Sequence, residues 1–383
     1  MAMKIMIVTN NFTPYSGGVV SSIKALTHEL HKAHHEVKVV TLGFLKDHSD
    51  DPAWIDRIYC PVRFAYKNNR MAIPWRARAH ISRALDEFKP DIVHLHHPFL
   101  LGPLALKESK KRNIPTIFTY HTLYEAYTHY VPLPLWLTRW YIKHKVTAFC
   151  QQVDGIVAPS SYMRNIITQS VATPVTVIPS GLLPEFKGAQ LIKQVNNRPI
   201  KLLVVSRMVK EKNLKVVLEV AKRLHNYQIP FELKLIGYGS EYDNLKQYAY
   251  DNLKLNPSQV VFVHKPPKEI IAQAYQDADL FLFPSHTDTQ GLVLAEAMAY
   301  STPVLALDGP GQRDIIKKGL NGYIVDTPEQ MVHKIHSITH NSSLPILSAG
   351  AYNTAQRYRA EMIAKRYVDF YRSVTEVQLQ LVK

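Results

Sequence analysis

The sequence is poor in cysteine and has no long apolar run. Of its 383 residues only Cys60 and Cys150 are cysteines, and their wide separation matches no disulfide framework, redox motif or thiolate metal site. A reducing compartment is therefore expected. The chain has no run of about 18 apolar residues, so no membrane-spanning helix is predicted. Asn10, Asn11 and Pro14 interrupt the apolar start of the chain, so a cleavable signal peptide is not predicted either.

Acidic residues are also scarce relative to basic ones. The chain has 46 Lys and Arg against 31 Asp and Glu, a formal net charge of +15. Residues 1–190 carry a net +9 and residues 191–383 a net +6. Basic proteins bind nucleic acid, anionic lipid or anionic small molecules, and composition alone leaves these three partners open.

Short apolar, β-branched runs alternate with helical patterns along the whole chain. The runs that predict strands are 4–9, 36–42, 91–97, 116–122, 155–160, 174–180, 200–207, 231–239, 259–265, 279–285, 303–308 and 322–325. Helical stretches such as 213–224 and 269–278 separate them, and the periodicity lapses in a Gly-, Pro- and Asn-containing segment at 180–199. This pattern predicts an α/β protein with two doubly wound domains, residues 1–185 and 186–360.

Two acidic residues lie where a predicted strand runs through a loop into a helix. Seven residues separate Asp288 from Glu296, Gly291 permits close backbone approach, and 292–298 are strong helix formers. Backbone N–H groups at a helix start attract anions, and a carboxylate accepts hydrogen bonds from vicinal hydroxyls. The segment suits a sugar nucleotide. The alternative is an ordinary helix with acidic residues near its N-terminus.

Other polar motifs also follow strands, where open parallel sheets bind ligands. Gly17 and Gly18 precede a predicted helix and could present N–H groups to a phosphate, or form an ordinary turn. Arg207 and Lys212 could bind a diphosphate and stabilise its developing charge, or be solvated surface charges. Gly237 could admit a base or phosphate, or belong to a plain strand-to-helix turn.

Histidines follow two of the predicted strands. A lone histidine such as His121 is more often structural than catalytic. His94 and His96 share one strand face and His97 points away, so a three-histidine metal site would need a bend. Because no carboxylate or thiolate is placed to complete such a site, we expect no metal and take these histidines as strand-end residues lining the acceptor side.

Two stretches of the first half, 62–85 and 131–149, mix aromatic with basic residues. Rings at the headgroup level and cations on lipid phosphates would suit a membrane interface. Core-facing helices with a solvated basic face are the alternative, and Pro74 prevents one continuous helix in the first stretch. The candidate membrane contacts in the second stretch are Trp136, Arg139, Trp140, Lys143 and Lys145.

Together these motifs resemble those of retaining glycosyltransferases of family 4. The form TQGLVLAEAMA at 289–299 resembles the diacylglycerol glucosyltransferase branch, and 120–130 resembles the YHT-x-YE-x-Y-x-HY segment of lipid glucosyltransferases. The resemblance implies the GT-B fold, two Rossmann-like domains facing across a cleft, with a C-terminal helix at about 361–383 that packs back on the first domain.

The resemblance also implies roles for individual residues. Glu296 would hold the donor ribose and Asp288 would touch the donor sugar, although most relatives have Glu where Asp288 stands. Arg207 and Lys212 would stabilise the leaving diphosphate, and His121 would lie at the donor sugar. The implied donor-binding residues are Gly17, Gly18, Gly237, Thr289, Gln290, Gly291 and Leu292. Tyr124 and Glu125 share the segment of His121 and are assigned to the acceptor side.

The implied activity is transfer of a hexose, glucose from UDP-glucose, to a lipid hydroxyl such as that of diacylglycerol. Retention at the anomeric carbon and no metal or other cofactor are expected, with the protein peripheral on the inner face of the cytoplasmic membrane. A lipopolysaccharide or soluble sugar acceptor is one alternative. A non-enzymatic basic scaffold that binds membrane or nucleic acid is a second. The intact donor motifs argue against the scaffold, so no nucleic-acid partner is expected.

Overall fold

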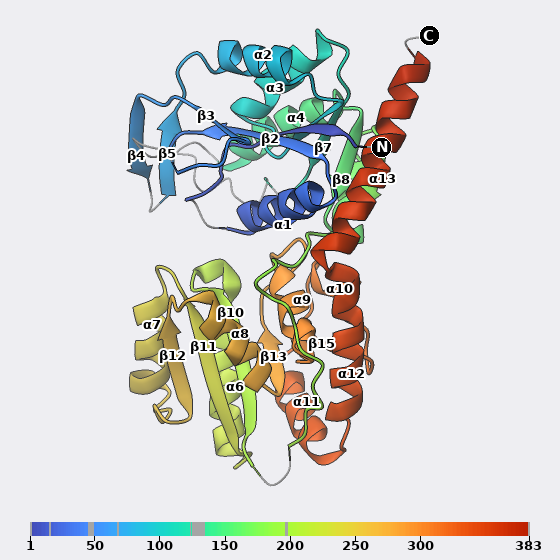
Figure 1. The fold of residues 1–383 in the computed structure, drawn as a ribbon. Helices are drawn as coiled ribbons and strands as arrows, with labels where there is room; N and C mark the ends of the chain where they lie inside the picture. The colour runs from blue at the N-terminus through green and yellow to red at the C-terminus, as the bar shows by residue number, and fades with distance from the viewer. Residues whose placement is uncertain are drawn as a thin grey trace. The chain divides into compact units, whose positions relative to one another are not determined.

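The chain forms two compact units, each built on its own sheet (Figure 1). The computed structural model describes residues 2–14, 17–44, 50–66, 69–122, 124, 135–195 and 198–381. The N-terminal unit comprises residues 1–181 together with 360–383, and the C-terminal unit comprises residues 182–359. The boundary at 181/182 lies within the segment 180–199, where the helical and strand periodicity lapses, and the chain's last helix belongs to the N-terminal unit.

The N-terminal unit contains a parallel sheet in the order β3-β2-β1-β6-β7-β8-β9. Its strands are β1 (Lys4–Val8), β2 (Glu36–Leu42), β3 (Ile55–Ile58), β6 (Ile92–Leu95), β7 (Thr116–Thr119), β8 (Gly155–Ala158) and β9 (Val175–Val177). Its helices are α1 (Gly18–Lys32), α2 (Ala77–Phe88), α3 (Leu101–Lys110), α4 (Leu135–Cys150), α5 (Ser161–Thr168) and α13 (Ala360–Leu381). The strand order reverses between β1 and β6, where ligands bind in such sheets.

Side chains that alternate along these strands are buried on both faces of the sheet. Met6 and Val8 pack with residues of α2, α3, α4 and α5. Ile5 and Ile7 pack with α1 and with Tyr371 of α13. Because both faces are covered, the strands are nearly continuous apolar runs, which is why they were predictable. The exception is β3, an edge strand of sequence IDRI that the apolar-run criterion missed.

The C-terminal unit contains a parallel sheet in the order β12-β11-β10-β13-β14-β15. Its strands are β10 (Ile200–Arg207), β11 (Phe231–Tyr238), β12 (Val260–His264), β13 (Leu280–Phe283), β14 (Val304–Leu307) and β15 (Gly322–Val325). Its helices are α6 (Lys215–Asn226), α7 (Tyr242–Gln247), α8 (Lys268–Asp277), α9 (Leu292–Ala299), α10 (Gln312–Ile315), α11 (Pro328–His340) and α12 (Leu344–Ala355). The strand order reverses between β10 and β13, so the prediction of two doubly wound sheets is confirmed.

A separate antiparallel hairpin of β4 (Val62–Tyr66) and β5 (Asn69–Ile73) stands outside the main sheet of the N-terminal unit. It was not predicted. Phe64 pairs with Met71, and each side chain is 46% exposed. Arg63, one position away, donates from Nε to the carbonyl of Gly43 at 2.9 Å. The hairpin therefore presents apolar side chains outward and anchors itself through a polar one.

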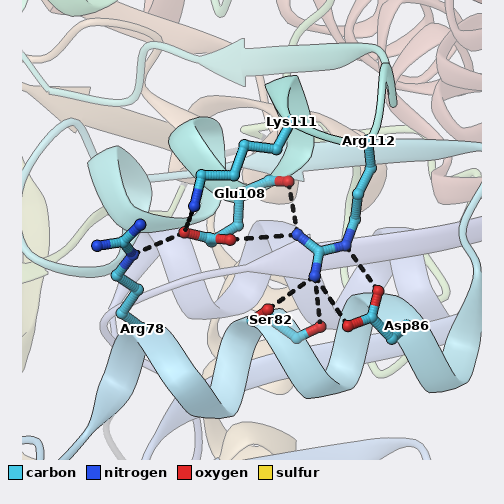
Figure 2. Close-up of polar contacts among 6 residues, drawn as sticks. All are labelled: Arg78, Ser82, Asp86, Glu108, Lys111 and Arg112. Carbon is cyan, nitrogen blue, oxygen red and sulfur yellow. Dashed lines mark hydrogen bonds and ion pairs between the residues drawn. The ribbon is translucent and has the colours of Figure 1, made fainter.

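Several basic residues of the N-terminal unit are bound in an ion-pair network between α2 and α3 (Figure 2). The buried carboxylate of Glu108 accepts from Arg78 at 2.7 Å, from Lys111 at 2.9 Å and from Arg112 at 3.2 Å. Arg112 also pairs with Asp86 at 2.8 Å. Hydrogen bonds from these cations lower the pKa of Glu108 to about 2, and the bond from Lys111 has the largest effect. Part of the positive charge predicted for membrane contact at 62–85 thus serves structure.

Candidate active site

Two loops meet at the carboxyl ends of β10 and β13 in the C-terminal unit. Arg207 is the exposed last residue of β10, and a short 3-10 turn follows at Lys210–Lys212. The loop after β13 contains Asp288. Thr287 Oγ1 donates to the carbonyl of Glu211 at 3.5 Å, and Asn213 Nδ2 donates to the carbonyl of Pro284 at 3.4 Å. The fold thus brings the predicted cationic loop next to the predicted acidic loop.

A direct ion pair joins these loops. Lys212 Nζ lies 2.6 Å from Asp288 Oδ1, and only 15% and 21% of the two side chains are exposed. The other carboxylate oxygen, Asp288 Oδ2, is buried and accepts no hydrogen bond from the residues that the structure describes. The ammonium orients the carboxylate and leaves one oxygen to accept a hydrogen bond from a ligand. Both residues were predicted, whereas their pairing was not.

Glu296 lies inside α9 and is only 8% exposed. Tyr275 of α8 donates its hydroxyl to Glu296 Oε2 at 2.9 Å. Burial is the main cause that raises the pKa of Glu296 to about 7. A carboxylate at such a position is costly for the fold unless a ligand or a proton compensates it. The sequence identified Glu296 but not Tyr275, which lies in an ordinary amphipathic helix.

Two glycines shape the loop before α9. Gly291, with φ +70°, is the N-cap residue of α9 and lies where the helix start was predicted. A Cβ on Gly311 would lie 2.6 Å from the carbonyl oxygen of Asp288 and 2.8 Å from the backbone nitrogen of Gln290. Gly311, which the sequence did not single out, therefore lets the 284–291 loop pack closely. Thr289 lies in this loop and Leu292 begins α9.

Packing between strands explains Gly237. A Cβ at this residue of β11 would lie 1.8 Å from the carbonyl oxygen of Ser206 in β10. This contact favours the structural alternative for Gly237, and its contact with a donor stays a prediction.

The glycine pair of the N-terminal unit lies where it was predicted, at the start of α1. Gly17 is the N-cap residue and has no side chain that could cap the helix, and α1 begins at Gly18. A Cβ on Gly18 would meet nothing within 4 Å, so local packing does not require glycine there. The backbone can be approached closely at this helix start, as a phosphate site needs.

His121 follows β7 and contacts a neighbouring strand end. His121 Nε2 lies 2.7 Å from His96 Nδ1, and the two rings stack with centroids 5.0 Å apart. Burial is the main cause that lowers the pKa of His121 to about 3. His121 is therefore a neutral imidazole at physiological pH. The sequence did not predict this contact.

The other two histidines, His94 in β6 and His97 just after it, have different contacts. His94 lies beside His96 with ring centroids 4.0 Å apart, whereas His97 Nδ1 accepts from the backbone N–H of Asn10 at 3.2 Å. The expectation that His94 lines the acceptor side is wrong, because His94 is fully buried against Tyr371 of α13. Among the described residues, no group of three His, Cys, Asp or Glu side chains is arranged to hold a metal ion.

Tyr124 packs inside the N-terminal unit. Its ring makes edge contacts with Phe99 and Tyr120, at centroid distances of 5.6 and 5.4 Å. Burial raises the pKa of Tyr124 well above its usual value. This position supplies a core-packing role, and the predicted role at the acceptor stays a prediction. Glu125 lies outside the described residues.

Between residues 136 and 145, α4 exposes both aromatic and basic side chains. Trp136 is 73% exposed and Trp140 is 62% exposed, and Arg139, Lys143 and Lys145 are exposed beside them. The exposed tryptophans do not fit a core-facing helix, whereas the three exposed cations fit the solvated basic face of that alternative as well. Membrane contact by them stays a prediction. Among the described residues, no helix is both long enough and apolar enough to cross a membrane.

Comparison with known proteins gives consistent matches over both units. The family descriptions Glycosyltransferase Family 4 and Glycosyl transferases group 1 match residues 16–186 and 190–357. The chain is 31% identical over 334 residues to the alpha-monoglucosyldiacylglycerol synthase of Streptococcus pneumoniae, covering 84% of this chain and 74% of that protein. It is 29% identical to the enzyme of the same name from Acholeplasma laidlawii, covering 96% of each.

A solved structure supports the same fold. The sucrose-phosphate synthase from Thermosynechococcus elongatus superimposes with a TM-score of 0.78 at 18% identity, covering 98% of this chain and 100% of that chain. Structural neighbours of this type are GT-B glycosyltransferases. The two family matches and the relative above 30% identity show that this chain belongs to glycosyltransferase family 4 and is a glycosyltransferase with the GT-B fold.

Proposed function

We propose that the protein transfers glucose from UDP-glucose to a hydroxyl of a diacylglycerol-type lipid, with retention of configuration. The observation that carries the proposal is the Lys212–Asp288 pair next to the Arg207 loop, in a unit that also buries Glu296. The names of two relatives, both alpha-monoglucosyldiacylglycerol synthases, support the choice of sugar and acceptor.

The donor is held by complementary charge. Arg207 and Lys212 contact the diphosphate, and the Glu296 carboxylate accepts hydrogen bonds from the two ribose hydroxyls. Asp288 Oδ2, which is buried without a hydrogen bond from the described residues, accepts from a hydroxyl of the sugar. Since Lys212 is already paired with Asp288, the arriving diphosphate shares its ammonium with that carboxylate.

The reaction breaks the bond between the anomeric carbon and the diphosphate oxygen, which leaves with the electron pair. The lipid hydroxyl oxygen forms its new bond on the same face, and its proton passes to the departing diphosphate. Arg207 and Lys212 stabilise the charge that develops on this leaving group, an effect that is large for fixed cations in a site of low dielectric. Two cations supply this role, so we propose that no metal is needed.

The acceptor side meets the membrane through the N-terminal unit. Trp136 and Trp140 insert at the headgroup level, and Arg139, Lys143 and Lys145 contact anionic phosphates. The protein is thereby peripheral on the inner face of the cytoplasmic membrane, where nucleotide sugars and lipid acceptors meet.

A panel of radiolabelled nucleotide sugars tests this function. The protein is incubated with each donor and with anionic vesicles containing diacylglycerol, and the extracted lipid is counted. We expect label from UDP-glucose, turnover that persists in EDTA, and an α-linked product by NMR. Nucleotide release without lipid label would favour a sugar acceptor. Absence of turnover with every donor would favour the non-enzymatic scaffold.

A further inference from the structure

A line of three histidine rings crosses the carboxyl ends of β6 and β7. His94 and His96 lie with ring centroids 4.0 Å apart, and His96 and His121 lie 5.0 Å apart. Of these three residues, only His121 was expected at the donor sugar. His94 and His96 are buried, with 0% and 1% of their surface exposed. Their role must therefore come from what they contact within the protein.

His94 anchors one end of this line in the core. Its Nδ1 lies 2.8 Å from the hydroxyl of Tyr371, and its Nε2 lies 2.7 Å from Thr119 Oγ1. The hydroxyl of Tyr367 reaches the same Thr119 oxygen at 3.3 Å. Both nitrogens of His94 are thus satisfied, and α13 fixes the ring against which His96 packs.

His96 has a different hydrogen-bond inventory. Its Nδ1 lies 2.7 Å from His121 Nε2, and its Nε2 is buried without a hydrogen-bond partner among the described residues. The contact between the two rings needs one proton, which either ring can supply. If His121 Nε2 carried it, the neutral His96 would have its own proton on Nε2, a buried N–H donor with nothing to bond.

The opposite assignment avoids that donor. With the proton on His96 Nδ1, the ring donates to His121 Nε2 and leaves only a bare lone pair on its own Nε2. Folded proteins leave buried N–H groups unpaired less often than acceptors, so the assignment that leaves only a lone pair unpaired is favoured. Burial keeps both rings neutral, which this argument requires.

We propose that His96 is a positioning residue that holds His121 in the tautomer protonated on Nδ1. This tautomer is the less favoured one for a neutral histidine in water, so the contact with His96 imposes it. His121 then has its Nε2 lone pair occupied and acts through Nδ1 as a hydrogen-bond donor, not as a base. The tautomer rests on the contacts alone, whereas its use on a donor sugar or acceptor rests on the proposed function.

Histidine tautomers can be measured directly. The full-length protein is labelled with ¹⁵N-histidine, and long-range ¹H–¹⁵N spectra of the side chains are recorded without substrate. The His121 signal is assigned by its loss in His121→Gln. We expect a protonated Nδ1 and an unprotonated Nε2 in the parent protein. The same signal in His96→Leu is expected to move to the Nε2-protonated form.

Two further variants separate positioning from general structural damage. In His96→Asn the amide N–H replaces the Nδ1 donor, so the parent tautomer of His121 should return. Tyr371→Phe removes a hydrogen bond of His94 but not the contact between His96 and His121, so it should leave the tautomer unchanged. An Nε2-protonated His121 in the parent protein would overturn the proposal, and so would an unchanged signal in folded His96→Leu.

Turnover gives the second readout. If the proposed function holds, kcat falls by roughly tenfold in His96→Leu and recovers in His96→Asn. If no donor is turned over but the tautomer is as expected, the proposed function fails and the positioning role of His96 stands. The parent spectrum decides the tautomer even if His96→Leu does not fold.

Discussion

The candidate residues of the two units differ in their electrostatics. The C-terminal unit gathers ionisable groups, with Lys212 paired to Asp288 and with Glu296, whose pKa burial raises to about 7. The N-terminal unit gathers neutral imidazoles, with His121 and His96 both uncharged because they are buried. Charged groups suit a diphosphate and ribose, whereas neutral groups orient hydroxyls without competing for the anion. The difference predicts that charge removal harms the C-terminal unit most.

The largest expected effect is on turnover when the phosphate-binding cations are removed. In the proposed reaction Arg207 and Lys212 stabilise the leaving diphosphate, so Arg207→Met and Lys212→Met should each lower kcat by roughly 10²- to 10³-fold. Steady-state kinetics with the labelled donor measures it. Lys210→Met is the matched control, because Lys210 is an exposed lysine of the same turn. An equal loss in the control would reduce the effect to general surface charge.

Glu296 should control donor affinity more than turnover. If Glu296 holds the donor ribose as proposed, Glu296→Ala removes charge-assisted hydrogen bonds to its hydroxyls, so affinity for the nucleotide should fall by roughly 100-fold. Calorimetric titration with UDP measures this change. Tyr275→Phe, which leaves the carboxylate in place, should have a smaller effect. Unchanged affinity in Glu296→Ala would remove its assigned role.

The same carboxylate should make the protein less stable at high pH. Its pKa is raised to about 7 by burial, so the folded state holds a proton that the unfolded state has released above its ordinary pKa of 4.5. Stability is therefore lost as the pH rises from about 4.5 to about 7, by up to about 3 kcal/mol. Glu296→Gln keeps an acceptor for Tyr275 and cannot ionise.

Scanning calorimetry at two pH values tests this stability effect. Glu296→Gln should melt at a higher temperature than the parent at pH 8, and the two proteins should melt close together at pH 5. The variant would then be more stable and bind donor less well, as expected when a site strains the fold for function. The same difference at both pH values would contradict the assigned ionisation.

Sequence and structure agree where a pattern is local. Each of the twelve apolar runs predicted as strands contains a strand, since parallel strands buried on both faces leave a continuous signal. The short motif containing Asp288 and Glu296 was likewise readable. Edge strand β3 and the β4–β5 hairpin were missed, because polar residues interrupt β3 and the hairpin turns its apolar side chains outward.

Contacts between distant residues were not predictable in this way. His94 and Tyr371 are 277 residues apart, and Lys212 and Asp288 are 76 apart. No spacing rule links such pairs, because sheet order and helix packing decide which residues meet. This is why the charged residues of the C-terminal unit were identified but not their pairing, and why the contacts that join His94, His96 and His121 were missed.

The smallest expected effect concerns the exposed cations of α4. Replacing Arg139, Lys143 and Lys145 by Ser should weaken binding to anionic vesicles by roughly tenfold at low salt and by less at high salt, because ions screen exposed charge. Vesicle sedimentation measures it. The control replaces Lys246, Lys254 and Lys318, three exposed lysines of the C-terminal unit, and removes the same charge. Equal weakening in both variants would show that net charge alone attracts the protein. A loss confined to the α4 variant would show that the exposed cations of α4 contact the anionic lipid surface, a role for charge that the N-terminal unit keeps apart from its neutral histidines.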